Sequence, residues 1–265
     1  MAWTGAIAYT FQIYFDFSGY SDSDGARWYG IESSVAAWHQ YAFFTDNGGM
    51  LQCVDLNSMT LKYAVDTDGD GDAGVVIEES ADNNTIFLYA ANKADGRNAA
   101  EGRDKAYIRK IDGRTGTVAW TKTFDVSAEN AGGAYAPVHI GKNELNGTII
   151  ASLSAAALND GTDGGLIIAL DKSTGEEKWR VEQADGIWSA PVVIYDENGK
   201  GYILQCDRGG KLTLYSGIDG QAMCSIDLGS RIESTPAVFN NTLVVGTRGV
   251  DGSGQGPKIV GIRIG

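Results

Sequence analysis

The sequence predicts an all-β protein, a β-propeller of about five four-stranded blades. Two repeats and the composition support this fold class. A nine-residue turn motif recurs four times without gaps, a strand-like motif recurs out of phase with it, and 36 of the 265 residues are glycine. Short strands that repeat every 45 to 59 residues and are joined by glycine-rich turns are typical of propeller blades.

Each copy of the nine-residue motif follows a short apolar strand and predicts a β-hairpin. Aspartate, the first residue of three copies, can accept hydrogen bonds from the turn amides, and glycine at the fifth position can adopt a positive φ. The ninth residue then packs on the return strand, so we expect Trp120 and Trp179 in the core. The copies are DLNSMTLKY from Asp55, DGRTGTVAW from Asp112, DKSTGEEKW from Asp171 and SGIDGQAMC from Ser216, with Met59, Gly116, Gly175 and Gly220 at the fifth position.

The strand-like motif marks the start of each blade. IESSVAAW from Ile31 matches IESTPAVF from Ile232, and YAPVHI and WSAPVVI have the same form. Each copy is followed by a hairpin and a second apolar strand, and the last blade has sequence for three strands. The predicted blade starts are Ile31, Gly74, Ala134, Ile187 and Ile232.

Residues 1–24 form a segment distinct from the propeller, which we expect over residues 25–265. Apolar and more polar residues alternate from Phe11 to Phe17, a period of two that favours a strand. The uncharged stretch before Asp16 is too short to span a bilayer, and it lacks the basic region of a signal peptide. We expect this strand to pair with the last blade, whose edge would otherwise be exposed.

The composition excludes several classes of function. A formal net charge of −13 repels phosphate backbones and anionic membrane surfaces, so we expect no nucleic-acid partner. Because the uncharged N-terminal stretch is too short to span a bilayer, we also expect no stable membrane span. With His39 and His139 as its two histidines, the chain has no histidine-rich metal centre and no recognisable hydrolase motif. The three cysteines, scattered without metal-binding spacing, are expected as small buried residues.

The repeat resembles the pyrroloquinoline-quinone-type (PQQ-like) propeller repeat. The resemblance rests on ALDKSTG from Ala169 with Trp179 and on the Ser-x-Pro strands at Ser189 and Ser234, and it covers about residues 25–265. Quinoprotein dehydrogenases of this type hold their quinone on a tryptophan floor, with calcium and often an adjacent cysteine pair. This chain is much shorter and has no Cys-Cys pair, so the resemblance implies the fold without the activity, and we expect no bound quinone.

A second resemblance concerns residues 9–22. YTFQIYFDFSGYSD is similar to a membrane-helix segment of the membrane-bound O-acyltransferases of the alginate-acetylation type. The similarity ends at Asp22, no membrane segment follows, and His39 does not lie in the histidine context of that family. The resemblance implies that residues 9–22 are a remnant of such a protein or a chimeric junction, unless this stretch forms a β-strand here.

The stretch DTDGDGD is the candidate metal site. Asp66, Asp68, Asp70 and Asp72 alternate within a glycine turn, where carboxylates can converge on one calcium ion. The twelfth position of the loop is Ile77, not the glutamate that completes a calcium loop. The alternative is a solvated acidic loop between two blades. Calcium is therefore the one cofactor candidate that we retain.

The inner strands supply the candidate binding residues, because inner strands of a propeller face its central channel. Trp188 stands at the head of one such strand, and Glu32 and Glu233 occupy matching positions in two blades. The alternative for the glutamates is a solvated cap at a strand end. The predicted channel-mouth set is Glu32, Ser33, Trp188, Ser189, Glu233 and Ser234.

Together these features favour a non-catalytic binding or scaffold module for a protein or glycan partner. The balance is against an enzyme, and we assign no catalytic residues. A quinoprotein-like oxidoreductase remnant and a fragment linked to a membrane-bound O-acyltransferase are the alternatives. Related propellers in the PQQ-like family are envelope scaffolds, which implies an extracytoplasmic or cell-surface location, although the chain shows no signal peptide.

Overall fold

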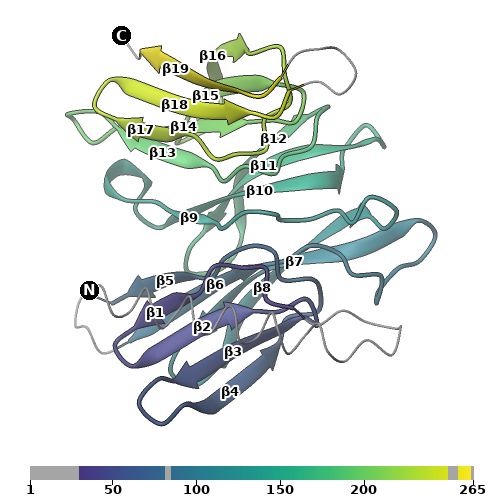
Figure 1. The fold of residues 1–265 in the computed structure, drawn as a ribbon, viewed down its shortest axis with the longest axis vertical. Helices are drawn as coiled ribbons and strands as arrows, with labels where there is room; N and C mark the ends of the chain where they lie inside the picture. Colours follow the sequence, from purple (N-terminus) through teal and green to yellow (C-terminus); the bar gives the residue numbers. More distant parts are fainter. Residues whose placement is uncertain (1–29, 81–84, 250–255, 264–265) are drawn as a thin grey trace. The chain divides into compact units, whose positions relative to one another are not determined.

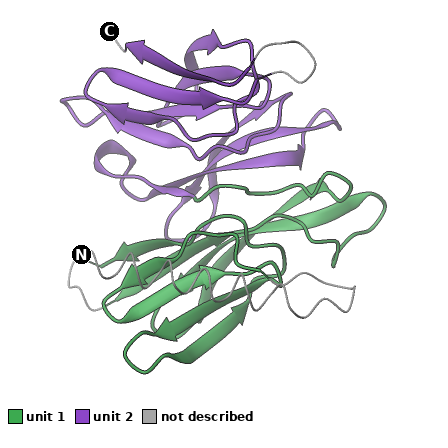
Figure 2. Ribbon diagram, in the orientation of Figure 1, with its two compact units in different colours: residues 1–137 green, residues 138–265 purple. Residues whose placement is uncertain are grey.

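The computed structural model describes residues 30–80, 85–249 and 256–263. Strands and their connections make up nearly all of this part, and its one helical element is a short 3-10 turn at Asn143–Leu145. The chain divides into two compact units, residues 1–137 and 138–265 (Figure 2). The predicted segment 1–24, which includes the closing strand from Phe11 to Phe17, lies outside the described residues.

Unit 1 contains two four-stranded antiparallel meanders, in which consecutive strands pair (Figure 1). A shared apolar cluster joins them, and β2 contributes Phe43 and β6 contributes Leu88 to it, both fully buried. The first meander is β1 (Ala36–Trp38), β2 (Tyr41–Thr45), β3 (Met50–Asp55) and β4 (Thr60–Asp66), and the second is β5 (Val76–Glu79), β6 (Ile86–Ala91), β7 (Arg103–Asp112) and β8 (Val118–Ser127).

Unit 2 contains two further four-stranded meanders and a three-stranded one (Figure 1). Ile167 and Ile203 lie in the apolar cluster between the first two, and Leu212 and Leu243 lie in the next. The strands are β9 (His139–Ile140), β10 (Thr148–Ala157), β11 (Asp163–Asp171) and β12 (Glu177–Gln183); β13 (Val192–Tyr195), β14 (Gly201–Cys206), β15 (Lys211–Ser216) and β16 (Ala222–Asp227); and β17 (Ala237–Phe239), β18 (Thr242–Thr247) and β19 (Lys258–Arg263).

These five meanders agree with the predicted number of blades. The first strand of each sheet begins within five residues after the predicted blade start, for example β5 at Val76 after Gly74. The last sheet has three strands among the described residues, as the sequence predicts. Within each unit, apolar residues fill the spaces between successive meanders, which is how blades bury their faces.

The nine-residue motif forms the predicted hairpin in all four copies. In the turn between β11 and β12, Gly175 has a φ of 75° and donates its amide to the carbonyl of Asp171 at 2.8 Å. The carboxylate of Asp171 accepts a hydrogen bond from the amide of Ser173 at 2.9 Å. Met59, the exception at the glycine position, adopts the same left-handed region with a φ of 56°. The left-handed backbone conformation at the fifth position of the motif is thus kept even where the residue is not glycine.

The two motif tryptophans are less buried than the sequence analysis expects. Trp179 packs against the apolar cluster of unit 2 but is half-buried, and Trp120 is half-buried as well. Both stand on the fourth strand of their blade, the strand farthest from the first.

The meander topology sorts the turns of each blade to two opposite ends. The turns between first and second strands and between third and fourth strands share one end, which we call the hairpin end. The turns between second and third strands share the other end with the links between blades, and we call it the loop end. The acidic stretch after β4, Trp188 before β13 and Glu233 before β17 all lie on such links, and therefore at the loop end of their own unit.

Candidate functional site

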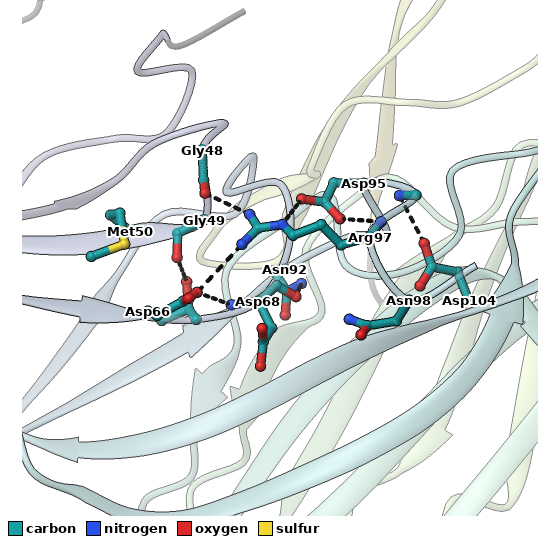
Figure 3. Close-up of polar contacts among 12 residues, drawn as sticks. Gly48, Gly49, Met50, Asp66, Asp68, Asn92, Asp95, Arg97, Asn98 and Asp104 are labelled. Atoms are coloured by element: carbon teal, nitrogen blue, oxygen red, sulfur yellow. Dashed lines mark hydrogen bonds and ion pairs between the residues drawn. The ribbon is translucent and has the colours of Figure 1, made fainter. Parts of the chain in front are cut away.

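The acidic stretch of unit 1 is held by cationic side chains from neighbouring segments. Figure 3 shows one of them, Arg97, beside Asp66. Arg97 donates to the carbonyl of Gly48 at 2.5 Å, and its guanidinium lies 3.5 Å from a carboxylate oxygen of Asp66. Asp68 pairs with the largely buried Arg109 at 3.2 Å. The first two carboxylates of the stretch thus have separate arginine partners.

Asp70 and Asp72 share the ammonium group of Lys93, which lies 3.1 Å from the first carboxylate and 2.7 Å from the second. Asp70 and Lys93 also exchange two backbone hydrogen bonds, of 2.9 and 3.0 Å, which hold the side chains side by side. Burial, and secondarily the carboxylate of Asp72, raise the pKa of Asp70 to about 7. The Oδ1 atoms of both aspartates are buried and make no hydrogen bond in the described structure.

The predicted calcium ligands are therefore distributed over three side-chain cations. Lys93 lies between Asp70 and Asp72, where a metal ion would have to lie to use both carboxylates. In the three described ranges, no group of three or more Asp, Glu, His or Cys side chains is arranged to hold a metal ion. Calcium at this stretch stays a prediction, and any ion would compete with the ammonium group.

The predicted channel-mouth serines clamp the backbone. Ser189 is fully buried, and its hydroxyl donates to the carbonyl of Cys206 at 2.8 Å. This bond ties the segment that enters a blade to the end of the second strand of that blade, which gives the recurring serine a structural role. The same clamp joins Ser33 to Thr45 at 2.9 Å and Ser234 to Gly246 at 2.9 Å.

Trp188 and Glu233, two members of the predicted set, meet around an arginine that the sequence analysis did not select. The guanidinium of Arg208 lies over the indole ring of Trp188, 3.9 Å from the ring centre. Its Nε lies 3.3 Å from a carboxylate oxygen of Glu233 without the geometry of a hydrogen bond. Three separate segments at the loop end of unit 2 supply these side chains.

Two further arginines face the same carboxylate. Arg248 lies 3.3 Å and Arg231 3.7 Å from Oε1 of Glu233. We call Trp188, Arg208, Arg231, Glu233 and Arg248 the arginine group. One carboxylate thus faces three guanidinium groups, a local excess of positive charge in a chain whose formal charge is −13. Guanidinium groups recognise carboxylate and other oxyanions through paired, charge-assisted hydrogen bonds.

Asp207 precedes Arg208. Among the described residues, it forms no ion pair with the three arginines of the arginine group. Its carboxylate accepts a hydrogen bond from the amide of Lys211 at 2.9 Å and thereby shapes the turn between β14 and β15. Burial raises the pKa of Asp207 above its ordinary value. Among the described residues, Glu233 is the carboxylate that forms ion pairs with all three guanidinium groups.

The matching glutamate of unit 1 has no such surroundings. Glu32 is exposed, and none of the described arginines forms an ion pair with it. A sequence comparison could have found Arg208, because the stretch Asp207–Gly210, DRGG, is a copy of Asp46–Gly49, DNGG, and both follow the second strand of a blade. The arginine stands where the first copy has asparagine, at the loop end.

The described residues do not fit a quinone site of the dehydrogenase type. The face of Trp188, the tryptophan predicted near the channel, is covered by the guanidinium of Arg208. The indole of Trp179 is engaged elsewhere, since it donates to the carbonyl of Gly217 at 3.2 Å. Cys53, Cys206 and Cys224 lie on three different strands, so no adjacent pair forms. Cys53 and Cys206 are buried as expected, but Cys224 is exposed, which corrects the expectation for that residue.

The sequence matches a family model over residues 104–203, which is less than half of the chain. That model describes the β-propeller domain of glucose, ethanol and alcohol dehydrogenases, the PQQ type. No curated protein matches the sequence. Helices that could cross a bilayer are not found in the described part of the chain.

Solved structures with a similar fold include proteins of different function. BamB from Moraxella catarrhalis is 14% identical, with a TM-score of 0.55 over 88% of this chain and 61% of that one. A europium-containing methanol dehydrogenase is 9% identical, with a TM-score of 0.61 over 87% of this chain and 56% of that one. BBS1N, solved in complex with ARL6DN, is 9% identical, with a TM-score of 0.56 over 89% of this chain and 66% of that one.

This chain spans less than two thirds of the length of BamB and of the methanol dehydrogenase. At these identities the similarity concerns the fold alone, and it agrees with the blades seen in both units. The chain therefore has the PQQ-like β-propeller fold, with about five blades described.

Proposed function

We propose that this chain is a non-catalytic binding module, and that the arginine group holds an acidic group of a protein or glycan partner. The observation that carries the proposal is the set of three guanidinium groups within 3.3 to 3.7 Å of the single carboxylate of Glu233. A carboxylate or sulfate from a partner would complete the charge balance. Trp188 would supply a flat apolar surface beside it, and aromatic and arginine side chains are enriched at binding surfaces.

The polar chemistry around the arginine group supports binding over catalysis. The hydroxyl of Ser189, which follows Trp188, is buried and donates to a backbone carbonyl, and the hydroxyl of Ser234, which follows Glu233, donates to the carbonyl of Gly246. Burial raises the pKa of the Cys206 thiol to about 12, so this thiol is neutral and unreactive near pH 7. Salt-bridged arginines position an anion but do not transfer protons at neutral pH.

The proposal extends to location. A propeller that binds acidic protein or glycan partners is suited to an extracytoplasmic or cell-surface setting, where such ligands are abundant. The family resemblance of the repeat supports this location. The alternative functions have less support: the covered face of Trp188 disfavours a quinoprotein-like oxidoreductase, and the acyltransferase-like residues 9–22 lie outside the described part of the chain.

Chemical-shift mapping tests the proposal. A triglutamate peptide and a trimer of galacturonic acid represent the two partner classes, and a Trp188→Phe variant assigns the Trp188 indole N–H resonance. We expect a saturable shift of this resonance with at least one probe, at about 0.15 M salt, and a smaller shift of the Trp179 resonance. Equal small shifts of both tryptophans with both probes would contradict a binding site at the arginine group.

A further inference from the structure

We propose that a groove at the hairpin end of unit 2 binds an uncharged peptide segment of a partner protein in extended conformation. The groove has a volume of about 700 Å³, within the range of ligand sites. It lies between the sheet of β13 to β16 and the sheet of β17 to β19. The lining residues are Val192, Val193, Ile194, Tyr195 and Asp196 from β13 and its end, Tyr202 and Leu214 from the same sheet, and Val238, Asn240 and Asn241 from β17 and its turn.

The groove follows the backbone edge of β13. Val193 and Tyr195 pack their side chains against the apolar cluster shared with the preceding meander, whereas Val192 and Ile194 pack against the cluster shared with the next one. Successive side chains of a strand point to opposite faces of its sheet, so a space that touches all four residues must run along the edge of the strand. The edge offers backbone groups to the groove.

The backbone groups on this edge have no partner strand. Among the described strands, β13 pairs with β14 alone. The amide of Asp196 donates to the carbonyl of Lys200 at 3.0 Å and closes the turn between the two strands. Hydrogen-bonded residues alternate with non-bonded ones along an antiparallel pair, so Ile194 turns its backbone groups to β14, and Val193 and Tyr195 turn theirs to the groove. A strand edge of this kind can pair with an extended peptide.

The charges around the groove favour an uncharged ligand. Asp196 supplies the carboxylate of the lining, and this carboxylate accepts hydrogen bonds from the amides of Asn198 and Lys200, both at 2.9 Å. It also accepts one from the hydroxyl of Tyr202 at 3.3 Å. No lysine or arginine is among the described residues that line the groove, and Glu197 and Lys200, in the same turn, are exposed and carry opposite charges.

The opposite wall of the groove offers side-chain amides. Asn240 and Asn241 are exposed in the turn between β17 and β18, and their amide groups form no hydrogen bond with the described residues. Each amide can both donate to and accept from a peptide bond. Leu214 and Val238 supply apolar surface for one side chain of the peptide. The groove thus combines a free strand edge, an amide wall and an apolar contact, as the addition of a short strand requires.

The peptide N-acetyl-Thr-Val-Thr-amide tests the proposal by nuclear magnetic resonance on the full chain labelled with ¹⁵N-tyrosine. The Tyr195→Phe variant assigns the backbone amide signal of Tyr195, which faces the groove. The same peptide with its three residue amides N-methylated lacks these donors and is the control ligand. Asn241→Ala removes one amide of the opposite wall, and Asn159→Ala, at an exposed turn residue of unit 2 outside the groove, is the matched control.

We expect a saturable shift of the Tyr195 amide signal with a Kd of about 1 mM, and binding at least about tenfold weaker for the methylated peptide. Asn241→Ala should bind about fivefold more weakly, and Asn159→Ala like the wild type. No saturable shift below about 10 mM peptide, equal affinities for the two peptides, or equal affinities of the two asparagine variants would overturn the proposal. A shift of the Tyr195 signal on dilution without peptide would assign the groove to a second copy of the chain and also overturn it.

The proposal goes beyond the function proposed for the arginine group and is tested separately from it. The peptide carries no charge, so Arg208→Gln should bind it with the affinity of the wild type. An equal loss of affinity in Arg208→Gln and Asn241→Ala would contradict a site at the hairpin end, because Arg208 lies at the loop end.

Discussion

Gly220 shows how a hairpin of this propeller depends on the absence of one side chain. Its φ is 72°, and a Cβ atom placed on it would lie 2.7 Å from the ring of Trp179. Gly229 has a φ of 67° with open space around it and isolates the backbone effect. We expect Gly229→Ala to cost about 1 kcal/mol of unfolding free energy, and Gly220→Ala about 1–2 kcal/mol more. Equal losses in urea unfolding would show that the ring does not pack against the turn.

Asp70 predicts a pH dependence of stability. Its folded pKa, about 7, lies above the unfolded value, so the folded chain binds the proton more tightly than the unfolded chain. Stability should therefore fall as the pH rises from about 4 through 7. Between pH 5 and 8 the wild type should lose about 1–2 kcal/mol more than Asp70→Asn, measured by urea unfolding. Parallel profiles for the two proteins would show that Lys93 fully compensates the buried charge.

The competition between Lys93 and a metal ion gives a further expectation at this scale. Oxygen ligands select calcium, and we expect saturable heat with calcium in the millimolar range, lost in Asp68→Ala. Lys93→Met removes the ammonium between Asp70 and Asp72 and should tighten calcium binding at least about tenfold. If neither the wild type nor Lys93→Met gives heat, the solvated acidic loop is the correct interpretation.

At the scale of elements, the serine clamp explains why one residue type recurs at the start of blades. Ser189→Ala leaves the buried carbonyl of Cys206 without this donor and should cost about 1–3 kcal/mol. Ser234 makes the same bond in an exposed position, so Ser234→Ala should cost less than about 1 kcal/mol. Thermal unfolding compares the two variants, and a larger loss for Ser234→Ala would contradict the structural role of the clamp.

The hairpins and blade starts could be predicted because the forces that set them are local. The Asp171 carboxylate and the positive φ of Gly175 act within five residues, and apolar alternation repeats at each strand. The half-burial of Trp179 could not be predicted in this way. Its exposure depends on its place in the fourth strand of the blade and on what packs beyond it, which a single motif does not encode.

At the scale of the whole molecule, the sequence located one part of the candidate site but not its chemistry. Trp188 and Glu233 were predicted from their places at strand heads, and they do lie in one group. Arg208 and Arg248 come from turns 40 residues apart, and their approach to Glu233 depends on how two blades pack. The same limit applies to Lys93, which reaches the acidic stretch from the segment that follows β6. A site built from several loops can be recognised only when the positions of the blades that carry those loops are known.

The most direct test of the binding function is the effect of Arg208 on affinity. Calorimetry with the acidic probe that shifts the Trp188 resonance should show at least about a tenfold loss for Arg208→Gln, since the guanidinium faces both Trp188 and Glu233. Arg180, another arginine of unit 2, pairs with Glu177 at 2.5 Å, and Arg180→Gln should bind like the wild type. Equal affinities of Arg208→Gln and Arg180→Gln would contradict the account.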